Sequence, residues 1–242
     1  MTVLILGAGS DMAVALARQF AAEKYDVQLA ARNTSFLQAQ ENDLRIRYGI
    51  NASSHAFDAV DFASHPAFYE SLPVKPDITI CVFGYLGDQE LGQSNWQEAS
   101  RIIHTNYTGA VSILNVVAAD YAARRQGTII GISSVAGERG RQSNYLYGSA
   151  KAGFTAYLSG LRNRLFHNGV HVMTVQPGFV YTRMTEGLTL PPLLTAQPTD
   201  VASAIVKAAK VKKNVLYVKW FWRYIMLIIK SIPEFIFKKL KL

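Results

Sequence analysis

The sequence predicts a single-domain α/β protein built on a doubly wound parallel sheet with helices on both faces. Three observations lead to this prediction. Short apolar runs alternate along the chain with segments of helical periodicity. Most of these runs are continuous rather than alternating, which is typical of strands that are covered on both faces. The first run ends in a glycine-rich turn, a feature of strand–helix units that bind phosphate groups.

Composition bounds the class of protein. The chain has 242 residues, half of them apolar, which is enough for one large α/β domain. Its only cysteine, Cys81, lies in an apolar run and is expected to be a buried thiol in a reducing compartment. The chain begins directly with an apolar run, so we expect no signal peptide and favour the cytoplasm. The net charge is +8, but no nucleic-acid module is recognised and nucleic acid is not expected as a partner.

The predicted domain covers residues 1–218. Its expected strands are Thr2–Leu6, Val27–Ala31, Ser54–Phe57, Asp77–Val82, Thr128–Ile132, His171–Gln176 and Val215–Val218. Helical spacing of apolar residues runs from Ala13 to Phe20 and around Trp96–Ala123, Tyr145–Phe166 and Asp200–Ala209. Right-handed crossovers between the strands give the doubly wound sheet. The segment Thr182–Pro198 has little periodicity, and a loop of this length is typically functional or mobile.

The turn after the first expected strand is a candidate dinucleotide site. Glycines let the backbone turn tightly and approach a pyrophosphate, which then sits on the N-terminus of the next helix. An ordinary strand–helix turn has the same appearance, but the position at the start of a strand–helix–strand unit favours the cofactor site. The residues expected to bind the cofactor here are Gly7, Gly9, Ser10, Asp11 and Met12.

The second expected strand ends in Ala30-Ala31-Arg32. An NAD-selective site has a carboxylate at this place for the ribose 2′-hydroxyl, and neither alanine supplies one. Arg32 can pair with a 2′-phosphate, so NADP is favoured over NAD; the alternative is an Arg32 that stacks on adenine or faces solvent. Asp58 follows the third strand and either binds the adenine amino group or caps the loop.

Tyr147 and Lys151 stand four residues apart on an expected helix and therefore share one face. The ordinary pKa of tyrosine, about 10, is too high for easy proton exchange at neutral pH. A nearby ammonium favours the phenolate and lowers that pKa. The tuned phenol can then give a proton to a carbonyl oxygen or take one from an alcohol. Ser134, at the end of the fifth strand, can hydrogen-bond the same oxygen.

These residues resemble the motifs of the short-chain dehydrogenase/reductase family, in its single-domain branch, over residues 1–218. The resemblance implies a Rossmann-like fold and an NAD(P)-dependent oxidoreductase. It implies that Tyr147 is the acid/base, and that Lys151 lowers its pKa and binds the nicotinamide ribose. Ser134 would position and polarise the substrate carbonyl, and Asn106 would hold a water that feeds a proton relay. No metal is implied.

Other positions match the family's cofactor-binding segments, and two of these segments depart from its pattern. The segment around the nicotinamide carboxamide is matched by Pro177, Gly178, Val180 and Thr182. The family's turn Gly-x-x-x-Gly-x-Gly has Asp11 and Ala13 in place of its second and third glycines. A carboxylate near a pyrophosphate is unfavourable unless it points away or caps the helix. The usual Asn-Asn-Ala-Gly after the fourth strand reads Cys-Val-Phe-Gly, of which Gly84 remains as an expected cofactor contact.

Residues 219–242 are expected to form an amphipathic, membrane-associating tail. A polar stripe recurs on an otherwise apolar and aromatic segment at Lys219, Arg223, Lys230, Glu234, Lys238 and Lys241. The longest uncharged run, Tyr224–Ile229, spans about 9 Å as a helix and cannot cross about 30 Å of hydrocarbon. Trp and Phe at headgroup depth with Lys and Arg toward anionic lipid are typical of an interfacial helix. The alternative is that the tail packs on its own domain or forms a dimer interface.

The tail also resembles the branch of the family that includes decaprenylphosphoryl-keto-pentose reductase, which reduces a lipid-linked keto-sugar at a membrane. We therefore expect a carbonyl reductase of a polyprenyl-phosphate-linked keto-sugar, peripheral on the inner face of the membrane. Residues 187–194 are expected to form an apolar lid, or else a bare surface loop. The runner-up is a reductase of a steroid-, retinoid- or acyl-like ketone. An NADP-sensing membrane scaffold is the non-enzyme alternative, and the family implies a homodimer or homotetramer.

Overall fold

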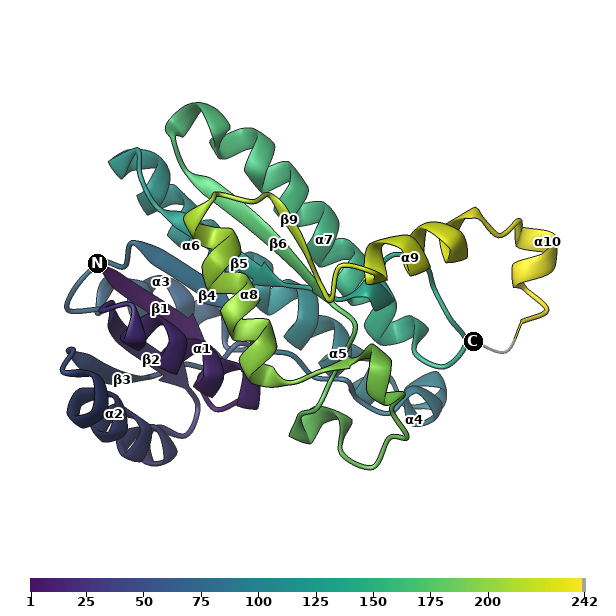
Figure 1. Ribbon diagram of the computed structural model, residues 1–242, viewed down its shortest axis with the longest axis horizontal. Coiled ribbons are helices and arrows are strands. Elements are labelled where there is room, and N and C mark those ends of the chain that lie inside the picture. Colours follow the sequence, from purple (N-terminus) through teal and green to yellow (C-terminus); the bar gives the residue numbers. More distant parts are fainter. Residues whose placement is uncertain (241–242) are drawn as a thin grey trace.

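A seven-stranded parallel sheet with helices on both faces forms the body of the protein in the computed structural model, which describes residues 1–240 (Figure 1). The strands follow the order β3-β2-β1-β4-β5-β6-β9. All seven strands expected from the apolar runs are present, each within two residues of its predicted bounds. Their bounds are β1 (Thr2–Leu6), β2 (Asp26–Ala31), β3 (Ala52–Ala56), β4 (Ile78–Cys81), β5 (Thr128–Ile132), β6 (His171–Pro177) and β9 (Val215–Val218).

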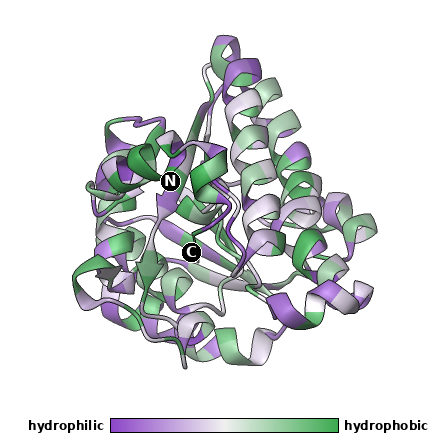
Figure 2. Ribbon diagram, turned by 90° about the vertical axis from the view of Figure 1, so that its right-hand side faces the viewer, coloured by the Kyte–Doolittle hydropathy of each residue, from purple (hydrophilic) through white to green (hydrophobic). Residues whose placement is uncertain are grey.

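Helices cover both faces of this sheet. One layer contains α1 (Asp11–Ala22), α2 (Thr34–Tyr48) and α8 (Pro198–Lys210), and the other contains α3 (His65–Glu70), α6 (Gly109–Arg124) and α7 (Tyr145–Leu165). The short α4 (Gln89–Ser94) and α5 (Trp96–Ile103) precede α6, and a π-helical turn over His104–Thr108 joins α5 to α6. Figure 2 shows hydrophobic and hydrophilic residues side by side along the outer helices, as expected for helices with one face on a buried sheet.

The helix α2 was not predicted from the sequence. Its fifteen residues are mostly polar, and only Leu37 and Leu44 among them are buried. It is fixed by its ends instead: the Asn33 side chain accepts a hydrogen bond from Phe36 N, and Gly49 ends the helix in the left-handed conformation. A helix with so few buried positions has almost no apolar periodicity to read.

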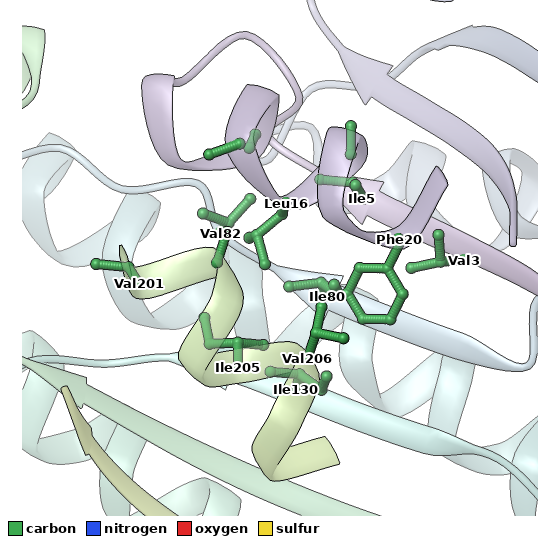
Figure 3. Close-up of a cluster of buried hydrophobic side chains, with 14 of the residues drawn as sticks. Val3, Ile5, Leu16, Phe20, Ile80, Val82, Ile130, Val201, Ile205 and Val206 are labelled. Atoms are coloured by element: carbon green, nitrogen blue, oxygen red, sulfur yellow. The ribbon is translucent and has the colours of Figure 1, made fainter. Parts of the chain in front are cut away.

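The apolar cluster drawn in Figure 3 fixes the start of α1 relative to the sheet. Leu16 and Phe20 of α1 lie over Ile5 and Ile80 of the sheet, with Ile205 of α8 beside them. All of these side chains are buried, and each contributes about 1.5–3 kcal/mol by leaving water. The glycine-rich turn that precedes α1 is therefore held at a defined place at the carboxyl end of β1.

Cys81 is buried in the cluster on the opposite face of the sheet, as predicted.

The strand order reverses between β1 and β4, and in doubly wound sheets ligands bind in the crevice beyond the strand ends at such a point. Gly7 sits there with φ of +94°, and a Cβ on it would lie 2.6 Å from Phe83 N, so no other residue fits. The backbone N–H groups of Val82 and Phe83 both donate to Leu6 O, at 3.0 and 3.1 Å. These bonds hold the segment after β4 without the asparagines that the family pattern has there.

The irregular segment that follows β6 is closed at its base by two very short strands. β7 (Phe179–Val180) pairs in parallel with β8 (Thr195–Ala196), and 3-10 turns lie between them at Arg183–Thr185 and Pro192–Leu194. Two-residue strands are too short for periodicity to reveal them, so neither was predicted. The pairing fixes the two ends of the segment 181–194 beside the carboxyl ends of the main strands.

The chain after β9 folds into α9 (Trp222–Ser231) and α10 (Glu234–Phe237), which project from the edge of the body in Figure 1. The inner face of α9 packs on the domain through the buried Trp222 and Met226, in a cluster with Val135. Among residues 1–240, no helix is long and apolar enough to cross a membrane. Lys241, the last member of the predicted polar stripe, lies outside the described residues.

Candidate active site

Ser134 and Tyr147 lie close together, and the Ser134 hydroxyl acts to lower the pKa of the Tyr147 phenol. Ser134 follows β5 and begins a 3-10 turn, where its Oγ accepts a hydrogen bond from Ala136 N at 3.1 Å. Tyr147 lies in the first turn of α7, and its neighbour Gly148 allows α7 to approach that turn closely, since a Cβ on Gly148 would lie 2.9 Å from Ala136 O. The close approach of helix and turn brings the two hydroxyl groups together.

Lys151 lies one helical turn beyond Tyr147 and is only 4% exposed. Its Nζ donates to Ile132 O at 3.0 Å and lies 5.7 Å from the centroid of the Tyr147 ring. Burial lowers the pKa of Lys151 to about 8, with the nearby Cys81 thiol acting in the opposite direction. The ammonium is thus a buried charge beside the phenol, held by a backbone carbonyl.

Burial also raises the pKa of Tyr147 to about 12, while its hydrogen bond with Ser134 acts in the opposite direction. The lowering of this pKa that we expected from Lys151 therefore does not dominate in this geometry. The phenol is protonated throughout the neutral range, which suits a group that donates a proton to a carbonyl oxygen.

Asn106 lies in the π-helical turn between α5 and α6 and is almost wholly buried. Its Nδ2 donates to Tyr85 O at 2.6 Å and to Ile102 O at 2.8 Å, and its Oδ1 accepts from Tyr85 N at 3.2 Å. A Cβ on Gly84 would lie 3.0 Å from Asn106 Oδ1 and 3.6 Å from Lys151 Nζ. The absence of a side chain at Gly84 therefore leaves space between these two groups.

The start of α1 offers the features of an anion site. The Ser10 side chain caps the helix by accepting from Ala13 N at 3.2 Å, and the N–H groups of Asp11 and Met12 precede the helical ladder. A Cβ on Gly9 would meet no atom within 4 Å, so the space above the turn is open. This open, N–H-rich turn fits a dinucleotide diphosphate.

The remaining predicted cofactor residues follow the carboxyl ends of β2, β3 and β6. Arg32 is exposed at the end of β2. The Asp58 side chain accepts from Val60 N at 3.0 Å, which is the loop-capping alternative, although this bond leaves its second oxygen for another partner. Pro177 ends β6, and a Cβ on the next residue, Gly178, would overlap the Trp222 indole. Val180 lies in β7 and Thr182 begins the 3-10 turn that follows.

Two functional candidates were missed from the sequence, and both come from that 3-10 turn. The backbone N–H of Arg183 donates to the Asp11 carboxylate at 2.8 Å, its Nε donates to the same carboxylate at 3.2 Å, and its Nη2 donates to Gly9 O. The next residue, Met184, reaches to 3.7 Å from the Cβ position of Gly84. The segment therefore spans from the glycine turn to the catalytic candidates. No local pattern could reveal a contact between residues so far apart in sequence.

Comparisons with known proteins find similar chains over almost the whole length of this one. A family model described as short chain dehydrogenase matches residues 1–191. An uncharacterized oxidoreductase of Mycobacterium tuberculosis strain H37Rv is 37% identical over 241 residues, covering 98% of this chain and 96% of that protein. The structure of a short-chain dehydrogenase from Sphingobium yanoikuyae in complex with NADPH matches with a TM-score of 0.84 at 22% identity, covering 97% of both chains. A variant of an actinorhodin polyketide ketoreductase with NADPH matches with a TM-score of 0.80 at 22% identity, covering 91% of this chain and 97% of that one.

Proposed function

The chain belongs to the short-chain dehydrogenase/reductase family, and on this premise we propose that it is an NADPH-dependent carbonyl reductase in which Tyr147 donates the proton. Membership makes it an NAD(P)-dependent oxidoreductase that acts on CH–OH or C=O groups. The observation that carries the proposal is the buried ammonium of Lys151 beside the phenol of Tyr147, with Ser134 at the turn on which the start of α7 packs.

The protein's own groups divide the proton chemistry between them. NADPH, when bound, supplies a hydride to the carbonyl carbon. Tyr147 is protonated at neutral pH and gives its proton to the carbonyl oxygen, while Ser134 donates a hydrogen bond to the same oxygen. The positive charge of Lys151 favours the phenolate that remains, which stabilises the state after proton transfer. Asn106 holds the backbone of Tyr85 and so keeps the edge of the site in place.

The preference for NADPH over NADH rests on the end of β2. Arg32 is exposed there, no carboxylate stands at Ala30 or Ala31, and a guanidinium suits a 2′-phosphate. Two structural neighbours contain NADPH, which supports the same preference. The residues proposed to contact the cofactor are Gly7, Gly9, Ser10, Asp11, Met12, Arg32, Asp58, Gly84, Tyr147, Lys151, Pro177, Gly178, Val180 and Thr182.

We further propose that the enzyme works on the inner face of the membrane, bound through the outer side of the tail, residues 219–242. The exposed side chains at 224, 227 and 228 share one face of α9, and Trp220, which precedes this helix, contacts Tyr224; every one of them is apolar or aromatic. The apolar face, as we call it below, consists of side chains that are each more than two-fifths exposed: Trp220, Tyr224, Leu227, Ile228, Phe235 and Ile236.

Charge complementarity favours an anionic lipid surface as the partner of the apolar face. Arg223 is exposed on α9, Lys238 and Lys239 are exposed just after α10, and the whole chain carries a net charge of +8. Aromatic side chains with basic neighbours are typical of helices that lie in the headgroup region. We also propose a boundary near residue 218 between the reductase body and these C-terminal helices, although the inner face of α9 packs on the domain.

The substrate we propose is a lipid-linked keto-sugar, because a membrane-bound site suits a ketone that is anchored in the bilayer. The segment 187–194 would then contribute an apolar wall, since Leu188 and Leu193 are exposed. A second candidate is an acyl-like ketone, which is favoured by the likeness to a polyketide ketoreductase. A homodimer or homotetramer is proposed from family membership alone.

The deciding experiment compares substrates on vesicles. The protein, bound to phosphatidylglycerol-containing vesicles, is given NADPH with a polyprenyl-phosphate keto-pentose or with a 3-ketoacyl thioester, and NADPH oxidation is followed by absorbance. Turnover of the keto-pentose alone supports the proposal, and turnover of the ketoacyl thioester alone supports the second candidate, an acyl-like ketone. Tyr147→Phe should lose at least about 100-fold in turnover and keep NADPH binding. A variant that keeps turnover would remove Tyr147 as the proton donor.

A further inference from the structure

Arg183 covers the glycine turn of the cofactor site, although it stands 172 residues from Asp11 in sequence. Its Nε donates to the Asp11 carboxylate at 3.2 Å and its Nη2 donates to Gly9 O. The backbone N–H of Arg183 also donates to Asp11, at 2.8 Å, so both main chain and side chain are fixed by one carboxylate. The guanidinium is thereby held beside the start of α1.

The N-terminus of α1, beside the expected diphosphate, is an unusual place for the Asp11 carboxylate. The start of a helix binds anions well, and here it lies where the dinucleotide diphosphate is expected. Asp11 is the first residue of α1, so its charge would oppose the diphosphate if it were unpaired. In the structure its two oxygens accept from Arg183 rather than pointing freely at the turn. The pair carries no net charge, which removes the conflict.

The guanidinium also has binding capacity to spare. Arginine has five side-chain N–H groups in a planar fork that matches phosphate oxygens. In the described part of the chain, two of the five have partners, the Asp11 carboxylate and Gly9 O. The remaining donors, on Nη1 and Nη2, are available at a side chain that is 61% exposed.

We propose that Arg183 is a ligand of the cofactor diphosphate and that Asp11 is the positioning residue that holds it over the glycine turn. The proposal rests on the proposed function only in assuming that NADPH binds. On this proposal Asp11, which replaces the second glycine of the family's turn, is part of the cofactor site. Met184, the next residue, reaches toward Gly84, so the same 3-10 turn connects the diphosphate end of the crevice with the catalytic end.

The test is a set of fluorescence titrations with NADPH and with adenosine 2′-monophosphate, which lacks the diphosphate. Arg183→Ala should weaken NADPH binding by about tenfold or more, because the diphosphate loses a ligand and Asp11 is left unpaired at the turn. Asp11→Gly should weaken it by less than about threefold, since the turn loses its repulsive charge together with the anchor of Arg183. The double variant should bind NADPH more tightly than Arg183→Ala alone. Adenosine 2′-monophosphate should bind all of them equally well.

A matched control is available at the other end of α1, where Lys210 of α8 pairs with Glu23. Lys210→Ala breaks the ion pair between Lys210 and Glu23. The side chains of this pair are 51% and 41% exposed, close to the 61% and 34% of Arg183 and Asp11. This variant loses the same charge and should keep its NADPH affinity. The proposal is overturned if Arg183→Ala binds NADPH as the parent does, if the double variant is as weak as Arg183→Ala, or if adenosine 2′-monophosphate binding falls in parallel. Failure of the parent protein to bind NADPH would instead reject the proposed function.

Discussion

Arg139 and Glu234 form an ion pair of 2.9 Å that ties the segment after Ser134 to the start of α10. Arg139 Nη1 also donates to Ile229 O at 2.7 Å and Ile232 O at 2.6 Å, and its guanidinium lies 3.7 Å from the centroid of the Phe237 ring. The preceding Glu138, whose side chain is 7% exposed, pairs with Lys230 at 2.7 Å. The C-terminal helices are therefore docked on the chain between Ser134 and Tyr147.

Arg139→Ala should release the C-terminal helices. The change removes charge-assisted hydrogen bonds to backbone carbonyls that end α9, and we expect a loss of about 2 kcal/mol in the free energy of unfolding. Limited proteolysis should then cut within residues 219–240 faster than in the parent. Glu234→Gln is the matched control: Glu234 is 78% exposed, so losing its charge should cost less than about 1 kcal/mol. Equal effects of the two variants would mean that the carbonyl contacts of Arg139 contribute little.

The tail shows what could be predicted from the sequence and what could not. Its amphipathic pattern was visible, but the sequence did not show which residues would face the domain and which would face outward. Lys219 donates to Leu193 O at 2.9 Å, Lys230 pairs with Glu138 and Glu234 pairs with Arg139. Half of the predicted polar stripe thus faces the domain, and aromatic residues are left outside. A stripe facing lipid headgroups and a stripe facing buried counter-charges have the same spacing, so only the fold distinguishes them.

The sheet and the catalytic candidates were predictable because their signals are local. A strand covered on both faces is a continuous apolar run, and Tyr147 and Lys151 share a face because four residues make about one helical turn. The contact of Arg183 with Asp11 has no such signal, because it depends on where the segment after β7 returns over the sheet. The raised pKa of Tyr147 was likewise missed, since burial is a property of the packed structure.

Lys151→Met should stabilise the protein at pH 7 while it abolishes turnover. Burial lowers the pKa of Lys151 from 10.5 to about 8, so the folded protein pays for a buried charge at pH 7. Each pKa unit corresponds to about 1.4 kcal/mol, which makes this cost on the order of 3 kcal/mol, less about 1 kcal/mol for the lost bond to Ile132 O.

The stability difference between the parent and Lys151→Met should change with pH in the direction set by the lowered pKa of Lys151. Between about pH 8 and 10.5 the unfolded chain binds more protons at Lys151 than the folded protein, so the free energy of unfolding of the parent rises with pH relative to the variant. Urea unfolding at pH 7 and pH 9.5 should therefore show the variant as the more stable protein at pH 7 and a smaller difference at pH 9.5. A difference that is constant with pH would show that Lys151 does not titrate in this window.

Arg32→Ala should weaken the binding of NADPH and leave that of NADH almost unchanged. An exposed guanidinium at the end of β2 can bind a 2′-phosphate but gains nothing from the 2′-hydroxyl of NADH. We expect NADPH affinity to fall by about tenfold or more and NADH affinity to stay within about twofold. Titrations of both cofactors against the parent and the variant measure this directly. Equal weakening of both would indicate that Arg32 stacks on the adenine instead.

Replacing two side chains of the apolar face should abolish membrane binding without harming the fold. In Leu227→Ser/Ile228→Ser both positions are exposed, so the change removes apolar surface that the domain does not bury. Co-sedimentation with vesicles of phosphatidylcholine and phosphatidylglycerol should show binding of the parent, weaker at high salt because basic side chains contribute about 1 kcal/mol each near an anionic surface. The double variant should remain in the supernatant.

The matched control is Ile46→Ser/Val211→Ser, which removes two apolar side chains that are at least as exposed and lie outside the C-terminal helices. This control should sediment with anionic vesicles as the parent does. Gel filtration of the same proteins tests the other occupant of the face, a second copy of the chain. If the parent ignores vesicles and elutes as a dimer that Leu227→Ser/Ile228→Ser converts to a monomer, the apolar face is a subunit interface and the membrane proposal is rejected.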